Sequence, residues 1–336
     1  MRKLSLIAAF GFGIVLFAAC NKNESKQQQL IAEPENETVL EASRVCASHE
    51  VLEEQMQADP SRRARLEELE SFTRKYIQNP SAYRLLADGT IEIPIHFNVV
   101  YKTSAENISN AQLQTQVDVL NEDYGYTNAD RNNISTTVFA GVVAGPIKIK
   151  FSWDPATGTT RKASTKTSWR TNDDVKRTSR GGIDPTSPTT KLNIWVCNLS
   201  NSILGYAQFP GGPAATDGVV LDNNCTGRGS GYSLFANYNL GRTATHEVGH
   251  WLNLRHIWGD ATCGNDQVND TPTHNTSNGG CPTYPHLSTC AGTPIEMTMN
   301  YMDYTYDRCM YMFSAGQAAR MMATFSSATA RASFAQ

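Results

Sequence analysis

The segment from residue 243 to residue 260 concentrates side chains that could bind a metal ion and use it. Its run HEVGHWLNLRH contains His246, Glu247, His250 and His256. On an α-helix, two residues four positions apart lie on one face, so the imidazoles of His246 and His250 would point to a common position. Neutral imidazole is a good zinc ligand, and three protein ligands leave the open coordination position that catalytic zinc requires.

Glu247 follows the first histidine and could reach a water molecule on the ion without binding the ion itself. Zinc lowers the pKa of its water and polarises a carbonyl group, while a nearby carboxylate takes the proton. The segment therefore predicts a hydrolytic zinc centre in which Glu247 is the general base. A helix that carries the HExxH pentapeptide by chance is the alternative, and the correctly spaced third histidine argues against it.

Asn253 stands at the turn that this interpretation requires. His256 lies six residues beyond His250, which is the wrong angle for the same helical face, so the helix must end and the chain must turn back. Such a turn places one residue at positive φ, which glycine adopts freely and asparagine tolerates next best. We expect asparagine to cost about 1 kcal/mol or less relative to glycine there.

Strand and helix patterns alternate in the part of the chain that must hold this segment. Alternating and β-branched residues predict strands at 90–101, 147–153, 191–199 and 217–224, and helical spacing after the potential cap Ser109 predicts a helix at 110–124. The chain after His256 is rich in Pro, Gly, Asn and Cys. We predict an α/β (α+β) domain with a mixed twisted sheet and helices in its upper half, a loop-rich lower half, and the metal between the halves.

The N-terminus has the form of an export signal. A basic start and an apolar run precede small residues and Cys20, as in a bacterial lipoprotein whose cysteine carries lipid; a nearby ordinary signal cut or an uncut membrane anchor is the alternative. A polar, low-complexity tether and a charged, helix-prone stretch outside the main core follow. We predict a signal peptide at 1–19, a lipidated tether at 20–42, a pro-segment at 43–83 and a catalytic domain at 84–336.

Charge and cysteine content restrict the partners and the compartment. With a net charge of −3, nothing in the charge balance argues for nucleic acid or an anionic membrane surface as a partner, and we expect no nucleic acid. Outside the cytoplasm the eight cysteines could form disulfides, and lipid on Cys20 leaves an odd number. Cys46 is the isolated cysteine, whereas Cys197 and Cys225 end neighbouring predicted strands and could pair.

The zinc segment, together with the later run NYMDYTYDRCMYMF, resembles the metzincin metallopeptidases, and within that clan the chain is similar to the pappalysin family. The likeness runs from about Ile91 to Phe313 and includes LNIWVCNL, LGYAQFPG, DGVVL and DTP. It implies a metzincin-like fold and a secreted zinc endopeptidase that acts on proteins or peptides and is a monomer when mature. A zinc amidase or deacetylase, and a zinc-binding surface lipoprotein without catalysis, are the rival interpretations.

The resemblance also assigns roles to single residues. It implies that Met302 forms the hydrophobic floor under the zinc and that Tyr304 stabilises the oxyanion of the transition state. It places Asp307 at the bottom of the S1′ pocket, where a carboxylate would select peptide bonds on the N-terminal side of Arg or Lys. The plain alternatives are a core methionine and a packed aromatic ring.

Further residues lie in the loop-rich half. Asp260, Asp266 and Asp270 suit a structural calcium ion such as family members carry, and a solvated acidic turn is the alternative. The family pattern suggests the disulfides Cys263–Cys290 and Cys281–Cys309, although spacing alone leaves three connectivities. These bridges would brace the specificity pocket.

Cys46 in the pro-segment resembles the cysteine switch of latent metzincins, in which a thiolate occupies the fourth coordination position of zinc; an incidental free cysteine is the alternative. Cleavage between Tyr83 and Arg84 would fit the predicted specificity and could be autocatalytic, with Thr73–Arg74 and Arg74–Lys75 as rival bonds. Any of these cuts would separate the domain from the lipid on Cys20. The precursor would then be an outer-membrane or periplasmic lipoprotein, and the mature domain would be released.

Overall fold

A computed structural model describes residues 44–79, 89–327 and 330–335 of the chain. The described residues belong to one compact unit, Ala42–Gln336. The predicted signal peptide, the tether with Cys20 and the Tyr83–Arg84 bond lie outside the described residues. None of the helices in the described part is long and apolar enough to cross a membrane.

A mixed sheet forms the first half of the domain. Its strands are β1 (Ile91–Tyr101), β2 (Ile149–Ser152), β3 (Thr159–Ala163), β4 (Leu192–Cys197), β5 (Gly205–Ala207) and β6 (Val219–Asp222). The order is β2-β1-β4-β6-β5, β3 also pairs with β1, and all pairs are parallel except that of β5 with β6. The predicted mixed sheet is confirmed, and the short strand β5 lies at its edge.

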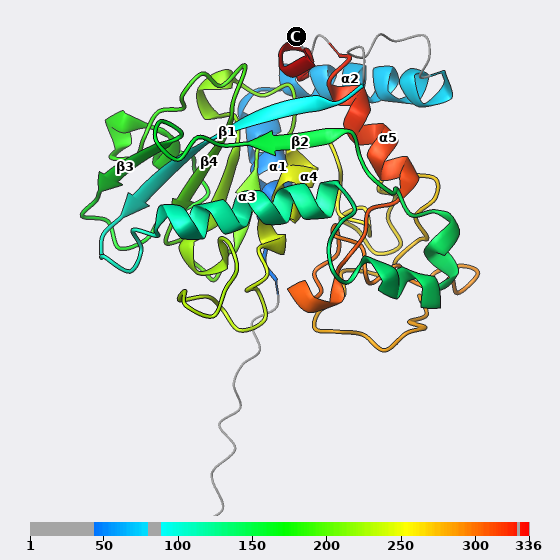
Figure 1. The fold of residues 1–336 in the computed structure, drawn as a ribbon. Helices are drawn as coiled ribbons and strands as arrows, with labels where there is room; N and C mark the ends of the chain where they lie inside the picture. The colour runs from blue at the N-terminus through cyan, green and yellow to red at the C-terminus, as the bar shows by residue number, and fades with distance from the viewer. Residues whose placement is uncertain (1–43, 80–88, 328–329, 336) are drawn as a thin grey trace, which may run out of the picture. The chain divides into compact units, whose positions relative to one another are not determined.

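Helices cover the sheet and connect it to the second half (Figure 1). They are α1 (Ser48–Ala58), α2 (Ser61–Gln78), α3 (Asn110–Tyr124), α4 (Arg242–Trp251) and α5 (Ala315–Thr324). The Ser109 side chain caps α3 by accepting a hydrogen bond from the Gln112 amide, as its position predicts. α4 packs against β5, β6 and α3, so the helix with the HExxH run lies directly against the edge of the sheet.

The second half consists largely of loops. Residues 252–306, all of which the structure describes, contain no helix and no strand. Two disulfides cross this region, Cys263–Cys290 and Cys281–Cys309, and both predicted pairings are confirmed. Buried side chains from both halves form one continuous core, which includes the strands, α4 and the methionines of the last hundred residues.

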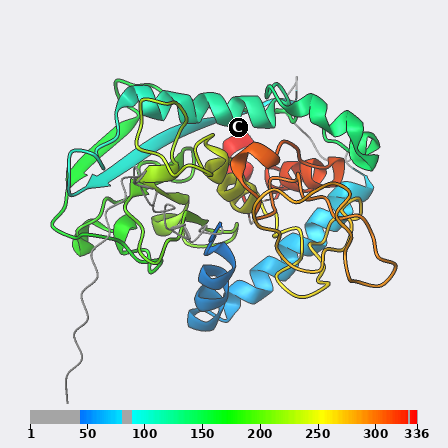
Figure 2. The same ribbon diagram turned by 90° about the horizontal axis from the view of Figure 1, so that it is seen from below.

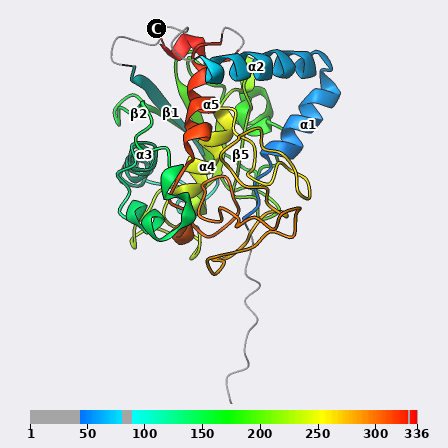
Figure 3. The ribbon, with the colours of Figure 1, turned by 90° about the vertical axis from the view of Figure 1, so that its right-hand side faces the viewer.

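The charged stretch before the domain is helical, as expected, but it is not outside the core. α1 packs against β5 and α2 packs against α5, as the views from below and from the side show (Figures 2 and 3). Leu69 and Tyr76 of α2 are almost fully buried, and Tyr76 belongs to the main core. Because α2 has few apolar residues, an ion pair also holds it against the domain: Arg320 of α5 pairs with Glu70 of α2.

Candidate metal centre

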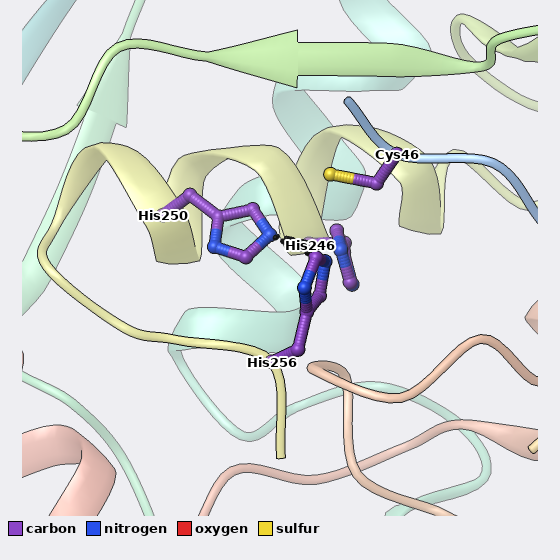
Figure 4. A group of neighbouring side chains, drawn as sticks. All are labelled: Cys46, His246, His250 and His256. Carbon is purple, nitrogen blue, oxygen red and sulfur yellow. Dashed lines mark hydrogen bonds between the residues drawn. The ribbon is translucent and has the colours of Figure 1, made fainter. Parts of the chain in front are cut away.

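The predicted zinc ligands converge. The Nε2 atom of His250 lies 3.1 Å from the Nε2 atom of His246 and 3.1 Å from that of His256. One ligand atom from each of these histidines and one from Cys46 lie within 4.8 Å of one another, and all four residues are buried. Figure 4 shows the Cys46 side chain, on an extended segment, pointing toward the three rings.

Hydrogen bonds on the far side of each ring prepare the histidines for a metal. Nδ1 of His246 lies 2.7 Å from the Tyr301 carbonyl oxygen, and Nδ1 of His250 lies 2.8 Å from that of Leu254. Nδ1 of His256 contacts the Asp260 carboxylate. These acceptors require the proton on Nδ1, so the three Nε2 atoms carry lone pairs.

A shared cation accounts for this arrangement. Burial, and then the neighbouring histidines, lower the pKa of His246 and of His250 well below the usual value, which keeps the rings neutral. Lone pairs facing one another at 3.1 Å repel unless a cation lies between them. Two nitrogens each about 2.0–2.1 Å from one tetrahedral zinc would lie about 3.3 Å apart, close to the observed spacing. The donor set therefore fits zinc.

The turn after α4 is formed as predicted. Asn253 has φ 73°, and it is the residue that reverses the chain between His250 and His256. The amide of Leu254 donates to the Gly249 carbonyl at 2.9 Å, and Arg320 Nε donates to the Asn253 carbonyl at 2.7 Å. The positive φ that asparagine accepts here places His256 beside the other two ligands.

Glu247 lies beside the cluster of ligand atoms, because its Oε2 atom is 3.4 Å from the Cys46 sulfur. Its side chain is buried, and burial raises its pKa to about 7. Gly205 of β5 lies so close that a Cβ atom there would come 2.9 Å from the Cγ atom of Glu247. Only glycine lets the edge strand approach the carboxylate without displacing it.

Met302 and Tyr304 both lie at this centre. The Met302 sulfur packs under α4 at Gly249, where a Cβ atom would come 2.5 Å from Sδ. The Tyr304 ring centroid lies 4.9 Å from that of His256, and the Tyr304 hydroxyl donates to the Cys46 carbonyl at 3.0 Å. The tyrosine therefore lies beside the ligand His256 and contacts the backbone of Cys46.

Residues 44–47, at the start of the predicted pro-segment, lie along the edge strand β5 and contact the metal centre. The Leu204 amide donates to the Val45 carbonyl at 2.9 Å, and the Ala47 amide donates to the Gly205 carbonyl at 3.1 Å, so residues 45–47 pair in parallel with β5. Between them, Cys46 projects toward the histidines and its Sγ lies 3.4 Å from Glu247 Oε2.

Two contacts of the pro-segment were not predicted from the sequence. The Ser48 hydroxyl donates to Glu247 Oε2 at 2.8 Å and accepts from the Ala207 amide at 2.8 Å. Arg44 Nη2 donates to Asp307 Oδ1 at 2.5 Å, and the two side chains are 1% and 0% exposed. The sequence spacing could have indicated these contacts, because Arg44 lies two residues before Cys46 and Ser48 lies two residues after it.

Asp307 is one of several residues that surround the Arg44 side chain, with which it forms a buried ion pair. Arg44 Nη1 donates to Thr243 Oγ1 at 3.1 Å, and the guanidinium lies 5.1 Å from the centroid of the Tyr238 ring. The second carboxylate oxygen of Asp307 accepts from the backbone amide of Leu240 at 2.9 Å. A planar cation thus has a carboxylate, a hydroxyl and an aromatic face around it.

The three aspartates considered for calcium do not converge. The Asp260 carboxylate contacts His256, as described above, and lies 3.5 Å from His49 Nδ1. Asp266 accepts from the Thr271 hydroxyl at 2.8 Å, whereas Asp270 accepts from the Ser314 hydroxyl at 2.6 Å. Within the described ranges, Cys46 and the three histidines form the only group of three or more His, Cys, Asp or Glu residues with ligand atoms this close.

The proposed pairing of Cys197 with Cys225 is wrong. Both remain free, buried thiols. Cys197 packs in a cluster with Trp195, whereas Cys225 packs with Leu204 and Tyr238, so their side chains belong to different parts of the core. The Cys225 thiol donates instead to the Leu204 carbonyl at 3.2 Å.

Comparisons with known proteins agree with this site. The Peptidase M43 family model, described as pregnancy-associated plasma protein-A, matches residues 192–326. The chain is 32% identical over 246 residues to an extracellular metalloprotease of Uncinocarpus reesii, covering 69% of this chain and 76% of the relative. It is 34% identical over 245 residues to an extracellular metalloprotease of Verticillium alfalfae, covering 70% and 77%.

Two solved structures are also similar. A promirolysin mutant of Tannerella forsythia superposes with a TM-score of 0.77 and 39% identity, covering 87% of this chain and 97% of that one. Mature mirolysin of the same organism, in complex with a cleaved peptide, gives a TM-score of 0.68 and 43% identity over 73% of this chain and 96% of that one.

Proposed function

Because the chain belongs to the pappalysin-type M43 family of zinc metallopeptidases, we propose that it is a secreted endopeptidase that cleaves on the N-terminal side of arginine or lysine. We also propose that it is made as a latent lipoprotein precursor and is a monomer when mature. Family membership makes the chain a hydrolase of peptide bonds with a catalytic zinc. The amidase or deacetylase and the non-catalytic zinc protein are therefore set aside.

The residues around the zinc site have complementary roles in peptide hydrolysis. Zinc on the three histidines would supply a Lewis acid that polarises the scissile carbonyl and acidifies water. Glu247, whose pKa burial raises to about 7, accepts a proton from the attacking water near neutral pH and returns it to the leaving amine. The Tyr304 hydroxyl, which bonds a backbone carbonyl in the precursor, donates to the oxyanion that develops on the substrate.

The Arg44–Asp307 ion pair carries the proposal on specificity. The pro-segment places its own arginine in the pocket of Asp307, two residues from the thiol that faces the zinc ligands. Both charges are almost completely buried, so bulk water solvates neither of them. Each charge therefore depends on the other, and on its hydrogen bonds, for stabilisation. A substrate arginine entering the same pocket would meet the same carboxylate, hydroxyl and aromatic ring.

A peptide library tests activity and specificity together. The precursor without its signal peptide, and the same chain with Glu247→Ala, are incubated with the library and zinc, and all cut sites are read by mass spectrometry. Cuts before Arg and Lys by the wild type alone are expected. Asp307→Ala should abolish the preference while leaving cleavage at other residues; an unchanged preference in this variant would refute the role of Asp307.

Latency is supported by the way the pro-segment fills the cleft. Cys46 faces the zinc ligands, Ser48 binds the general base, and Arg44 fills the pocket of Asp307. Cys46→Ala should give a precursor that hydrolyses peptides faster or matures faster. A profile identical to that of the wild type would count against latency by this thiol.

The structure of α2 bears on where maturation occurs. The bonds Thr73–Arg74 and Arg74–Lys75 lie inside this helix, and the Thr73 side chain is fully buried. A protease needs an extended substrate, so cleavage there requires α2 to unfold first. We therefore propose cleavage at Tyr83–Arg84, which N-terminal sequencing of the mature form would identify. Cleavage at Arg84 would also detach the domain from lipid on Cys20, and Cys20→Ala should yield a precursor that fractionates without membranes.

Calcium remains a proposal for the loop 260–271. Asp266 is 5% exposed, and burial raises its pKa to about 6, so a cation beside this carboxylate would favour its ionised form. Calcium prefers oxygen ligands, and backbone carbonyls of the loop would complete the shell. A calcium chelator too weak to remove zinc should lower the melting temperature, and added calcium should restore it; no change in either direction would remove the site.

A further inference from the structure

The first turn of the zinc helix contacts the loop that carries the specificity carboxylate. Arg242, the first residue of α4, is 6% exposed. Its Nη1 atom donates to the backbone carbonyl of Asp307 at 3.0 Å and to that of Met310 at 2.5 Å. One guanidinium therefore fixes the backbone on both sides of the short turn that follows Asp307.

The same residue also contacts the Asp307 side chain. The Arg242 backbone amide lies 3.3 Å from Asp307 Oδ2, next to the Leu240 amide at 2.9 Å. With Oδ2 held by these amides, the carboxylate presents Oδ1 to the guanidinium of Arg44. The amides at the start of a helix carry partial positive charge, which attracts the carboxylate oxygen that they contact.

Two acidic residues hold the guanidinium itself in place. Asp130 accepts from both terminal nitrogens, at 2.5 Å and 2.8 Å, and Asp123 lies 3.4 Å from Nη2. A planar fork with several donors can bind this carboxylate and two carbonyls at once, which a lysine ammonium cannot do in the same geometry. The Cys281–Cys309 disulfide also braces this turn, at Cys309.

We propose that Arg242 is a positioning residue for specificity: it fixes the Asp307 carboxylate at a set distance from the zinc ligands carried by the same helix. His246 lies one turn after Arg242, so the helix links the pocket for the P1′ side chain to the scissile bond. Selectivity for arginine then depends on this link as well as on the charge of Asp307, because a displaced carboxylate cannot meet the guanidinium of a correctly placed substrate. The inference rests on the proposed preference for Arg and Lys.

The test measures P1′ selectivity in mature Arg242→Lys. For wild type and variant, kcat and KM are determined on matched peptides with Arg or Leu at P1′. We expect the ratio of kcat/KM for Arg over Leu to fall at least tenfold, mainly through KM of the Arg peptide, while kcat for the Leu peptide changes less than threefold. Arg331→Lys is the matched control: this buried arginine donates to the Trp251 carbonyl at the other end of α4 and pairs with Asp217, so the substitution should lower the melting temperature and leave the ratio unchanged.

Two further variants separate positioning from a general loss of structure. In an Asp307→Asn background, Arg242→Lys should cause no additional loss of selectivity if it acts through Asp307. Asp307→Glu leaves Arg242 intact but moves the carboxylate by one methylene, so it should also lose selectivity and gives an answer even if Arg242→Lys does not fold. A wild-type ratio in Arg242→Lys or in Asp307→Glu would overturn the inference, whereas a wild-type enzyme without preference for Arg would refute the proposed specificity instead.

Discussion

Arg44→Ala in the precursor should open the active-site cleft without changing any group that faces the zinc ion. The substitution removes the buried ion pair with Asp307 and the bond to Thr243. Removing one partner of a buried ion pair costs about 3–5 kcal/mol, and a hydrogen bond to a charged group contributes about 1.5–3 kcal/mol. Asp307 keeps its bonds from the amides of Leu240 and Arg242, and water enters when Arg44 is gone, so about 3 kcal/mol applies.

Losing about 3 kcal/mol of the free energy that holds the pro-segment over the active site should raise the fraction of precursor with an accessible active site by about 100-fold, since 1.4 kcal/mol corresponds to a factor of ten. The assay is the initial rate of hydrolysis of a quenched fluorescent peptide, read before processed chains accumulate. Arg44→Lys keeps the charge and should change the rate less. Arg65→Ala removes a half-exposed pro-segment arginine that bonds the Gly211 carbonyl at 3.0 Å, and should have less than about a fivefold effect. If folded Arg44→Ala precursor is as inactive as wild type, the ion pair does not contribute to latency.

Three other substitutions test single features of the site and its support. Gly205→Ala should reduce activity of the mature enzyme at least tenfold, because its Cβ would come 2.9 Å from Glu247 Cγ and displace the general base; peptide hydrolysis measures this. Asn253→Gly should change the free energy of unfolding by no more than about 1 kcal/mol, because φ 73° suits both residues, and denaturant titration checks it. Burial raises the pKa of Asp303 to about 7 in the folded protein, whereas an aspartate in the unfolded chain has a pKa of about 4. The unfolded chain therefore loses this proton at lower pH, and the free energy of unfolding should fall as pH rises from about 4 to about 7. Asp303→Asn should flatten that decline in melting temperature, and an equally steep decline would show that another group causes it.

The zinc ligands and their turn were predictable because they depend on local geometry. Helical periodicity places His246 and His250 on one face, and the backbone tolerance of asparagine explains how Asn253 brings His256 back. The strand β3 was not predicted, because its residues are polar and partly exposed and show no alternation. The predicted pairing of Cys197 with Cys225 was wrong because the ends of two neighbouring strands can lie close together while their side chains enter different hydrophobic clusters.

In the predicted pro-segment, side chains that contact the site are spaced two residues apart, and this spacing is hard to recognise because the composition around them indicates a helix. Residues 44–48 lie before and at the start of α1, and the charged stretch around them indicates helix throughout. In an extended chain, however, alternate side chains point to one side. Arg44 and Cys46 use this spacing to contact Asp307 and the zinc ligands, while the backbone of Val45 between them pairs with β5. Ser48 is the first residue of α1 and contacts Glu247 after the chain turns into the helix at Ala47.

This spacing makes the three contacts depend on one register. A deletion of Val45 or Ala47 would shift the pairing by one residue and turn the alternating side chains to the other face. Latency should therefore be far more sensitive to such a deletion than to substitution of either residue by another small side chain, because only their backbones pair with β5 and none of the three contacts uses their side chains. An R-x-C-x-S pattern just before a charged helix is consequently a more specific signal of the proposed inhibition than an isolated cysteine, since each position contacts a different part of the same site.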